Sequence, residues 1–171
     1  MTPRSERGKA HRVVRDATVA DHPVVHSMNN AATPEVNALA PHEFEWLVSH
    51  ATYFRVLEDA EGVAGFLLCL ASGLDYWSEN YKWFTARHAQ FLYVDRVVVA
   101  ERVRGSGAGR ALYEDLHAFA SGRWPRIVSE VNIRPPNPAS IAFHERLGYA
   151  AVGVREYADG ANAVRMFERQ V

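Results

Sequence analysis

The chain has a single cysteine among its 171 residues. One cysteine excludes an internal disulfide framework and a zinc site built from cysteines. Apolar residues make up 48% of the chain, but no run approaches the roughly 20 apolar residues that span a bilayer. The N-terminus is charged and lacks the apolar segment of a signal peptide. We therefore expect a cytoplasmic protein that does not enter a membrane.

An excess of charge of either sign is also missing. Nineteen Lys and Arg residues face 20 Asp and Glu residues, for a net charge of −1. Such a balance argues against a general surface for nucleic acid or lipid. No repeat or internal linker interrupts the chain, and its length suits one domain with a substantial core. We expect a mobile tail over residues 1–10 and a single domain over residues 11–171.

The most informative stretch covers residues 91–120. Residues 91–99 are almost all Val, Leu, Tyr and Phe, which is typical of a strand buried on both faces. Residues 105–109 read Gly-Ser-Gly-Ala-Gly, and apolar residues then recur at helical spacing. The pattern predicts a strand, a tight turn and a helix whose first-turn amides and positive dipole end suit a phosphate. Positive charge is added by Arg102, Arg104 and Arg110.

Two known phosphate-binding loops fit this turn poorly. A Walker loop ends in Gly-Lys-Ser/Thr, whereas Arg110 and Ala111 follow the last glycine. A dinucleotide fingerprint has its third glycine at the position of Arg110, and it normally opens a domain. The segment does match the pattern Arg/Gln-x-x-Gly-x-Gly/Ala, through Arg104, Gly107 and Gly109. An ordinary glycine turn is the alternative for this motif taken alone.

A second motif follows a strand expected over residues 126–133. Two prolines end that strand, because neither can donate a hydrogen bond to a neighbouring strand. Asn137 is then placed to cap a helix that begins with proline and ends at a glycine. Residues 137–149 read NPASIAFHERLGY. Their spacing puts Asn137, Ser140 and His144 on one side of the helix.

Together the two motifs resemble those of the GNAT superfamily of N-acetyltransferases, whose first motif binds the acetyl-CoA pyrophosphate. The resemblance covers nearly the whole chain and is specific after residue 91. It implies an α+β fold with a mostly antiparallel central sheet flanked by helices. Two strands of that sheet, one with residues 97–99 and one with Glu130, are expected to splay apart so that acetyl-CoA enters between them.

The resemblance also implies which residues bind the cofactor. Main-chain groups of the first splayed strand contact the pantetheine arm, the glycine turn holds the pyrophosphate, and the second motif adds polar contacts. The implied set is Val97, Val98, Val99, Arg104, Gly105, Ser106, Gly107, Ala108, Gly109, Arg110, Asn137 and Ser140. We expect no metal. His22 and His26 have the spacing of a metal-binding pair, but the sequence offers no convincing third ligand.

Three side chains are candidates for proton transfer. Glu130 is our preferred base, directly or through water, because relatives with Glu in the matching strand often use it in this way. A carboxylate in mid-strand needs a partner, a cleft or a function. Asp95 raises the same question, with pairing to the adjacent Arg96 favoured and a base role left open. His144 stands where most relatives place a tyrosine that protonates the departing thiolate.

The acid role of His144 has an alternative. Its ordinary pKa of about 6.5 would leave the ring partly charged near neutrality, so that it could donate a proton. It could equally be a packed helix histidine. A backbone amide near Val99 could stabilise the oxyanion, and positioning of the two reactants could supply much of the rate without an essential base.

Residues 72–89 are rich in aromatic and polar side chains and predict neither a strand nor a clean helix. Such a segment can line a pocket, or it can be a satellite cluster that pins a long loop. In the first case the acceptor-binding residues are Tyr76, Trp77, Tyr81 and Trp83.

The expected activity is transfer of an acetyl group from acetyl-CoA to an amine, with a small-molecule amine favoured, by direct attack in a ternary complex. Two other classes stay open at this point. One is a CoA-binding or regulatory module without catalysis, and the other is a nucleotide-binding protein. The assembly is also open, and a homodimer is compatible with the resemblance.

Overall fold

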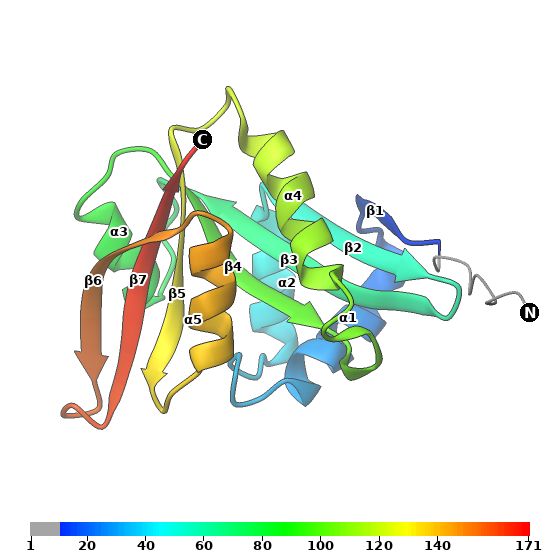
Figure 1. The fold of residues 1–171 in the computed structure, drawn as a ribbon, viewed down its shortest axis with the longest axis horizontal. Helices are drawn as coiled ribbons and strands as arrows, with labels where there is room; N and C mark the ends of the chain where they lie inside the picture. Colours follow the sequence, from blue (N-terminus) through cyan, green and yellow to red (C-terminus); the bar gives the residue numbers. More distant parts are fainter. Residues whose placement is uncertain (1–10) are drawn as a thin grey trace, which may run out of the picture.

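The computed structural model describes residues 11–171, so the tail expected over residues 1–10 lies outside the described part. Seven strands form one sheet in the order β1-β2-β3-β4-β5-β7-β6 (Figure 1). The strands are β1 (Val13–Asp16), β2 (Tyr53–Asp59), β3 (Gly62–Ala71), β4 (Leu92–Val99), β5 (Arg126–Arg134), β6 (Ala150–Tyr157) and β7 (Asn162–Gln170). The α-helices are α1 (His22–Ala31), α2 (Pro41–His50), α3 (Glu79–Thr85), α4 (Ala108–Ala120) and α5 (Pro138–Arg146).

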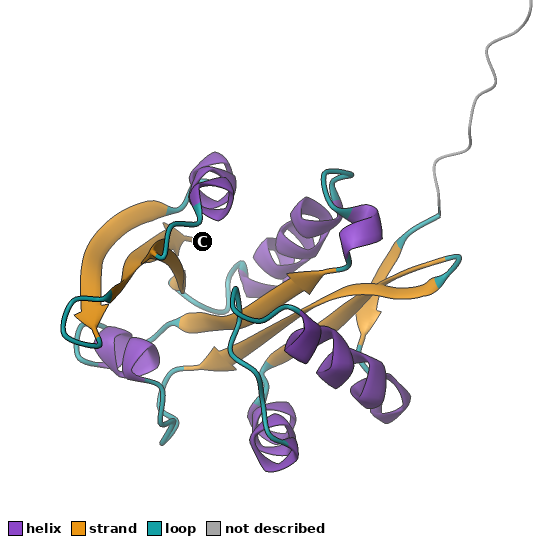
Figure 2. Cartoon of the chain, turned by 90° about the horizontal axis from the view of Figure 1, so that it is seen from below, coloured by secondary structure: helices purple, strands orange, loops and turns teal. Residues whose placement is uncertain are grey.

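Helices cover both faces of the sheet (Figure 2). On one face Val25 of α1 and Leu47 of α2 join a buried cluster, and on the other face α4 contributes Leu112 to a second cluster. Strand β5 contributes to both clusters, because Ile127 belongs to the second cluster and Val128 to the first. Such alternation is typical of a strand that is covered on both sides. The α+β fold expected from the resemblance is confirmed.

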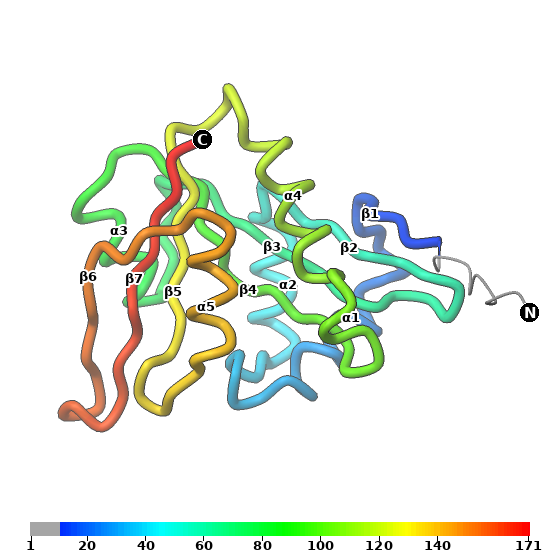
Figure 3. Tube along the Cα trace, in the orientation of Figure 1, coloured from blue at the N-terminus to red at the C-terminus, as the bar shows by residue number. Residues whose placement is uncertain are grey.

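All neighbouring strands are antiparallel except β4 and β5. These two run parallel and pair only at Leu92 with Ile127 and at Tyr93 with Val128. Beyond this point they diverge, as the trace in Figure 3 shows. The pairing of β4 with β3 shifts next to Asp95, which has no partner on β3. Such a bulge bends a strand, and here it lies just where β4 leaves β5.

Helix α3 corrects one expectation, because residues 72–89 were not predicted to contain a helix. The Ser78 hydroxyl accepts a hydrogen bond from the Tyr81 amide at 3.3 Å and caps the N-terminus. Tyr81 and Phe84 then enter the core at 1% and 0% exposure. The helix has only seven residues, too few for a periodic pattern to stand out among so many aromatic side chains.

Candidate active site

The glycine turn lies between β4 and α4, after a short 3-10 helix (Glu101–Val103). Gly105 and Gly107 have φ angles of +69° and +86°, which side chains rarely adopt. The Ala111 amide donates to the Gly107 carbonyl at 3.0 Å, so the amides between these residues precede the first helical hydrogen bond. A Cβ on Gly107 would meet nothing within 4 Å. The turn therefore presents amides to open space, as a phosphate site requires.

A cavity of about 610 Å³ lies in front of this turn. Nine of the twelve expected cofactor residues line it: Val97, Val99, Arg104, Gly105, Gly107, Ala108, Gly109, Arg110 and Ser140. The other three do not. The Val98 side chain is buried in the core on the opposite face, the Ser106 hydroxyl turns back to the Val103 carbonyl, and Asn137 lines a different cavity while it caps α5.

Five further lining residues were not expected from the sequence: Val103, Ala139, Phe143, Arg146 and Leu147. Phe143 packs against the turn, where a Cβ on Gly109 would come within 3.3 Å of its ring. Arg146 adds a cation from the last turn of α5. Conversely, Arg102 is not available to a ligand, because it pairs with Asp59 at 2.5 Å. The charge of Arg110 is shared with Glu114 at 2.9 Å.

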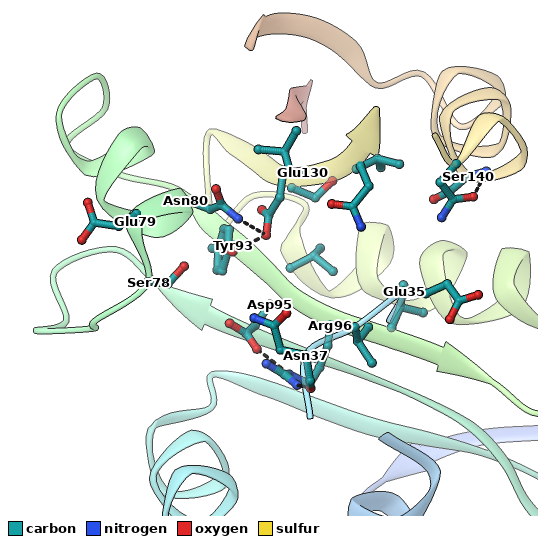
Figure 4. Close-up of a pocket in the computed structure, with 18 of the residues that line it drawn as sticks. Glu35, Asn37, Ser78, Glu79, Asn80, Tyr93, Asp95, Arg96, Glu130 and Ser140 are labelled. Carbon is teal, nitrogen blue, oxygen red and sulfur yellow. Dashed lines mark hydrogen bonds and ion pairs between the residues drawn. The ribbon is translucent and has the colours of Figure 1, made fainter. Parts of the chain in front are cut away.

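A second cavity, of about 800 Å³, lies where β4 and β5 diverge and extends towards α3 and the loop before α2 (Figure 4). Three residues line both cavities: Val97, Ser140 and His144. The two spaces therefore share one wall, which is the place where groups bound in each could meet.

Glu130 projects from β5 into the second cavity, as Figure 4 shows. Its Oε1 atom accepts hydrogen bonds from the Tyr93 hydroxyl at 2.8 Å and from the Asn80 amide at 3.1 Å. Its Oε2 atom is buried and has no hydrogen-bond partner among residues 11–171. Burial raises the pKa of Glu130 to about 7, and the nearby Asp95 adds to the increase. This carboxyl group can exchange a proton near neutral pH.

Asp95 is occupied in a different way. Its Oδ2 pairs with the Arg96 guanidinium at 2.6 Å, and its Oδ1 accepts from the Tyr76 hydroxyl at 2.5 Å. Arg96 also donates to the Asn29 side chain at 2.8 Å. The expected pairing of Asp95 with Arg96 is confirmed, and both carboxylate oxygens are engaged.

His144 is 4% exposed and lies among aromatic rings. Its Nδ1 is 2.7 Å from the Ser140 carbonyl, which can only accept, so Nδ1 carries the proton. Its Nε2 then accepts from the Tyr113 hydroxyl at 2.7 Å. Burial lowers the pKa of His144. Desolvation disfavours the imidazolium form, so the ring carries less charge near neutrality than its ordinary pKa would give it.

The four expected acceptor residues divide into two pairs. Tyr76 and Trp77 line the second cavity. Tyr81 and Trp83 do not. The Tyr81 hydroxyl donates to the Ala71 carbonyl at 2.6 Å inside the core, and the Trp83 ring covers Gly153. The segment at residues 72–89 thus has two roles: Tyr76 and Trp77 line a cavity, and Tyr81 and Trp83 pack the segment against the rest of the chain.

No metal site emerges from the described part of the chain, where no three His, Cys, Asp or Glu side chains are arranged to hold an ion. The His26 ring stacks on Phe44 at 4.8 Å, and His22 approaches the same ring at 5.7 Å. Cys69 is fully buried, which is typical of a free cysteine that packs as a small core residue. Over residues 11–171 no helix has both the length and the apolar character to cross a membrane.

Comparison with known proteins agrees with this geometry. The model of the Acetyltransferase (GNAT) family matches residues 22–149, and the chain belongs to that family. Arabidopsis thaliana NAA60 in complex with acetyl-CoA aligns with a TM-score of 0.75 at 15% identity, covering 94% of this chain and 100% of that chain.

Two further solved structures are similar. Ard1 from Thermoplasma volcanium aligns at 0.71 with 21% identity, covering 94% of this chain and 97% of that chain. The ribosomal-protein-S18-alanine N-acetyltransferase from Escherichia coli aligns at 0.69 with 16% identity, covering 94% of each chain. At such identities the likeness shows the fold. A search of curated protein sequences finds no significant match.

Proposed function

We propose that the chain transfers an acetyl group from acetyl-CoA to an amine, with a small-molecule amine favoured, by direct attack in a ternary complex. The observation that carries this proposal is the pair of cavities that share Val97, Ser140 and His144 as a common wall. One cavity has the features of a cofactor site. The other holds a carboxyl group whose pKa lies near neutrality.

The residues of the first cavity fit acetyl-CoA. The left-handed turn leaves free amides and open space for a pyrophosphate, and Arg104 and Arg146 supply positive charge at the cavity wall. Acetyl-CoA supplies a thioester that an amine can attack. This chain's own contribution is to hold the two reactants together, which by itself can supply much of the rate.

Glu130 is the proposed base. An amine has a pKa near 10 and is protonated at neutral pH, so it must lose a proton before or during attack. The carboxylate of Glu130, which lines the second cavity, accepts that proton directly or through one water. A base with a pKa near the working pH is the most effective choice for this step.

His144 is the proposed proton donor for the departing thiolate, in its imidazolium form. Burial lowers its pKa and so disfavours that form. We therefore expect a smaller contribution from His144 than from Glu130. The cytoplasmic location and a homodimer stay predictions.

The proposal is tested by measuring thiol release from acetyl-CoA with a panel of amines, followed by mass identification of the acetylated product. A CoA-binding or regulatory module would bind acetyl-CoA but release no thiol beyond the amine-free rate. A nucleotide-binding protein would be stabilised against heat more by ATP or NAD than by CoA. Either outcome would overturn the assignment.

The paired rings of Tyr113 and His144 give a prediction about stability. Tyr113 is fully buried, so His144→Phe leaves its hydroxyl without a partner and should cost about 1–3 kcal/mol of unfolding free energy. Tyr113→Phe should also destabilise. The double variant should lose less unfolding free energy than the two single variants together, since it removes both polar groups. Urea unfolding of the four proteins measures this, and strict additivity would show that the hydrogen bond contributes nothing.

Trp77, which precedes α3, and Trp83, which lies within it, should respond differently to substitution. Trp77 is 47% exposed at the cavity wall, so Trp77→Ala should raise the KM for the acceptor with little change in stability or in the KM for acetyl-CoA. Trp83→Ala is the matched control. Its half-buried ring packs on Phe84, and its loss should cost on the order of 2 kcal/mol without changing either KM. The same effect from both variants would mean that Trp77 is also structural.

A further inference from the structure

Arg155 places an uncompensated positive charge on the wall of the second cavity. It lies on β6, is half-buried and lines the cavity. Its Nε donates to Asn80 Oδ1 at 2.7 Å, and its guanidinium carbon lies 4.8 Å from the centre of the Tyr157 ring. No ion pair formed within residues 11–171 includes Arg155. Two contacts thus hold the side chain in place without neutralising it.

Most carboxylates around the same cavity already have partners. Glu79 forms an ion pair with Lys82 at 2.9 Å, and Glu43 accepts from the Ala40 amide at 2.7 Å. Lys82 lowers the pKa of Glu79, and Arg155 contributes only a minor part of that decrease. Asp95 is paired with its neighbour on β4, as described above. Glu35 lines the cavity on the side away from Asn80, as Figure 4 shows.

Asn80 fixes the spacing between Arg155 and the proposed base. Its Oδ1 accepts from Arg155, which orients the amide so that Nδ2 donates to Glu130 Oε1 at 3.1 Å. Two hydrogen bonds in series through one amide group place the Arg155 Nε and the Glu130 carboxylate within about 8 Å of each other. A substrate whose amine and carboxylate lie about 3 Å apart, with a hydrogen bond of about 2.8 Å from each group to the protein, spans a similar distance.

We propose that the acceptor is an amino acid, with a carboxylate one or two carbons from its amine, and that Arg155 binds this carboxylate while Glu130 receives the proton of the amine. This rests on the proposed acetyl transfer and adds the substrate class. A guanidinium presents several donors in a planar fork that matches a carboxylate. Asn80 is the positioning residue between the two groups.

The test compares α-amino acids with their carboxamides, which keep the amine and the side chain but lose the negative charge. The wild-type protein should show the higher kcat/KM with the acids, and Arg155→Met should lower that preference by roughly tenfold or more. Arg155→Met can also alter Glu130 through Asn80, but this change affects both substrates and cancels in the ratio of kcat/KM for the acid to kcat/KM for the amide. Arg155→Lys should retain part of the preference, and γ-amino acids should be poor substrates because their charges are too far apart.

Arg87→Met is the matched control. Its guanidinium also lies on an aromatic ring, 3.4 Å from the centre of Trp83, but Arg87 does not line the cavity. This variant should leave the acid-to-amide ratio unchanged. Equal kcat/KM for acids and amides in the wild-type protein would overturn the proposal, as would an equal loss for both in Arg155→Met.

A binding measurement separates this proposal from the proposed function. Wild type and Arg155→Met are titrated, in the presence of CoA, with an amino acid and with its amide, and melting temperature or NMR shifts are followed. The carboxylate subsite is supported if the wild-type protein binds the acid more tightly than the amide and Arg155→Met abolishes this preference. That conclusion holds even if no thiol is released, and only the proposed acetyl transfer then fails. Equal binding of acid and amide overturns the subsite.

Discussion

Glu130→Gln is expected to lower turnover by roughly 100-fold or more, the loss typical of removing a general base. The amide keeps the shape of the side chain, and its oxygen can still accept from Tyr93 and Asn80. Affinity for acetyl-CoA should not change. Glu145→Gln, an exposed position on α5 outside both cavities, is the control and should retain full turnover.

The pH dependence should change with the same substitution. Because burial raises the pKa of Glu130 to about 7, the rate of the wild-type protein should rise with pH through neutrality as the base loses its proton. This ascending limb should be absent in Glu130→Gln. Near-normal turnover with an unchanged profile would show that Glu130 is not the base and that positioning supplies the rate.

Stability offers a readout that needs no acceptor. The folded-state pKa of Glu130 lies above its ordinary value of 4.5, so the folded protein binds this proton more tightly than the unfolded chain does. The site therefore costs stability as pH rises from about 4.5 to 7. Glu130→Gln lacks that cost. Its unfolding free energy relative to wild type should increase over this window and level off above it.

Gly107→Val is expected to raise the KM for acetyl-CoA by roughly tenfold or more, because a side chain would stand where a phosphate must approach the main chain. The φ angle of +86° also makes the substitution strained. Gly122→Val controls for the strain. Gly122 has a φ of +72° and equally open space around it, but it lies outside the cofactor cavity. Both variants should lose similar stability, and only Gly107→Val should lose affinity. An unchanged KM in a folded Gly107→Val protein would remove the turn from the cofactor site.

Much of the fold follows from local signals in the sequence. The Asn137 side chain accepts from the Ser140 amide at 3.3 Å and begins α5 where expected. The glycine turn and the Val-rich strand were predictable because backbone conformation and two-sided burial restrict residue type directly. For the same reason most residues that line the first cavity, many of them glycines or other small residues, could be predicted from the sequence.

The acceptor side was harder to predict because it depends on contacts between distant segments. Asn80 and Arg155 are 75 residues apart, and nothing local marks Asn80 as a partner of Glu130 or Arg155 as a partner of Asn80. Tyr81 and Trp77 are both aromatic and close in sequence, yet one is in the core and the other on the cavity wall. The hydrogen-bond partner of His144 Nε2 is Tyr113, which lies 31 residues before it.

The brief pairing of β4 with β5 has a consequence for how the protein responds to its ligand. Because only two residue pairs join these strands, the sheet consists of two parts, β1–β4 and β5–β7, that meet at one end. A molecule bound in the gap completes the contact that the strands leave unmade, and it binds only the folded chain. Its binding energy therefore adds to the resistance to unfolding, by about 2.7 kcal/mol at a hundredfold excess over Kd. Amide hydrogen exchange along the open edge of β4 should slow when CoA is added, whereas exchange in the β2–β3 hairpin should change little.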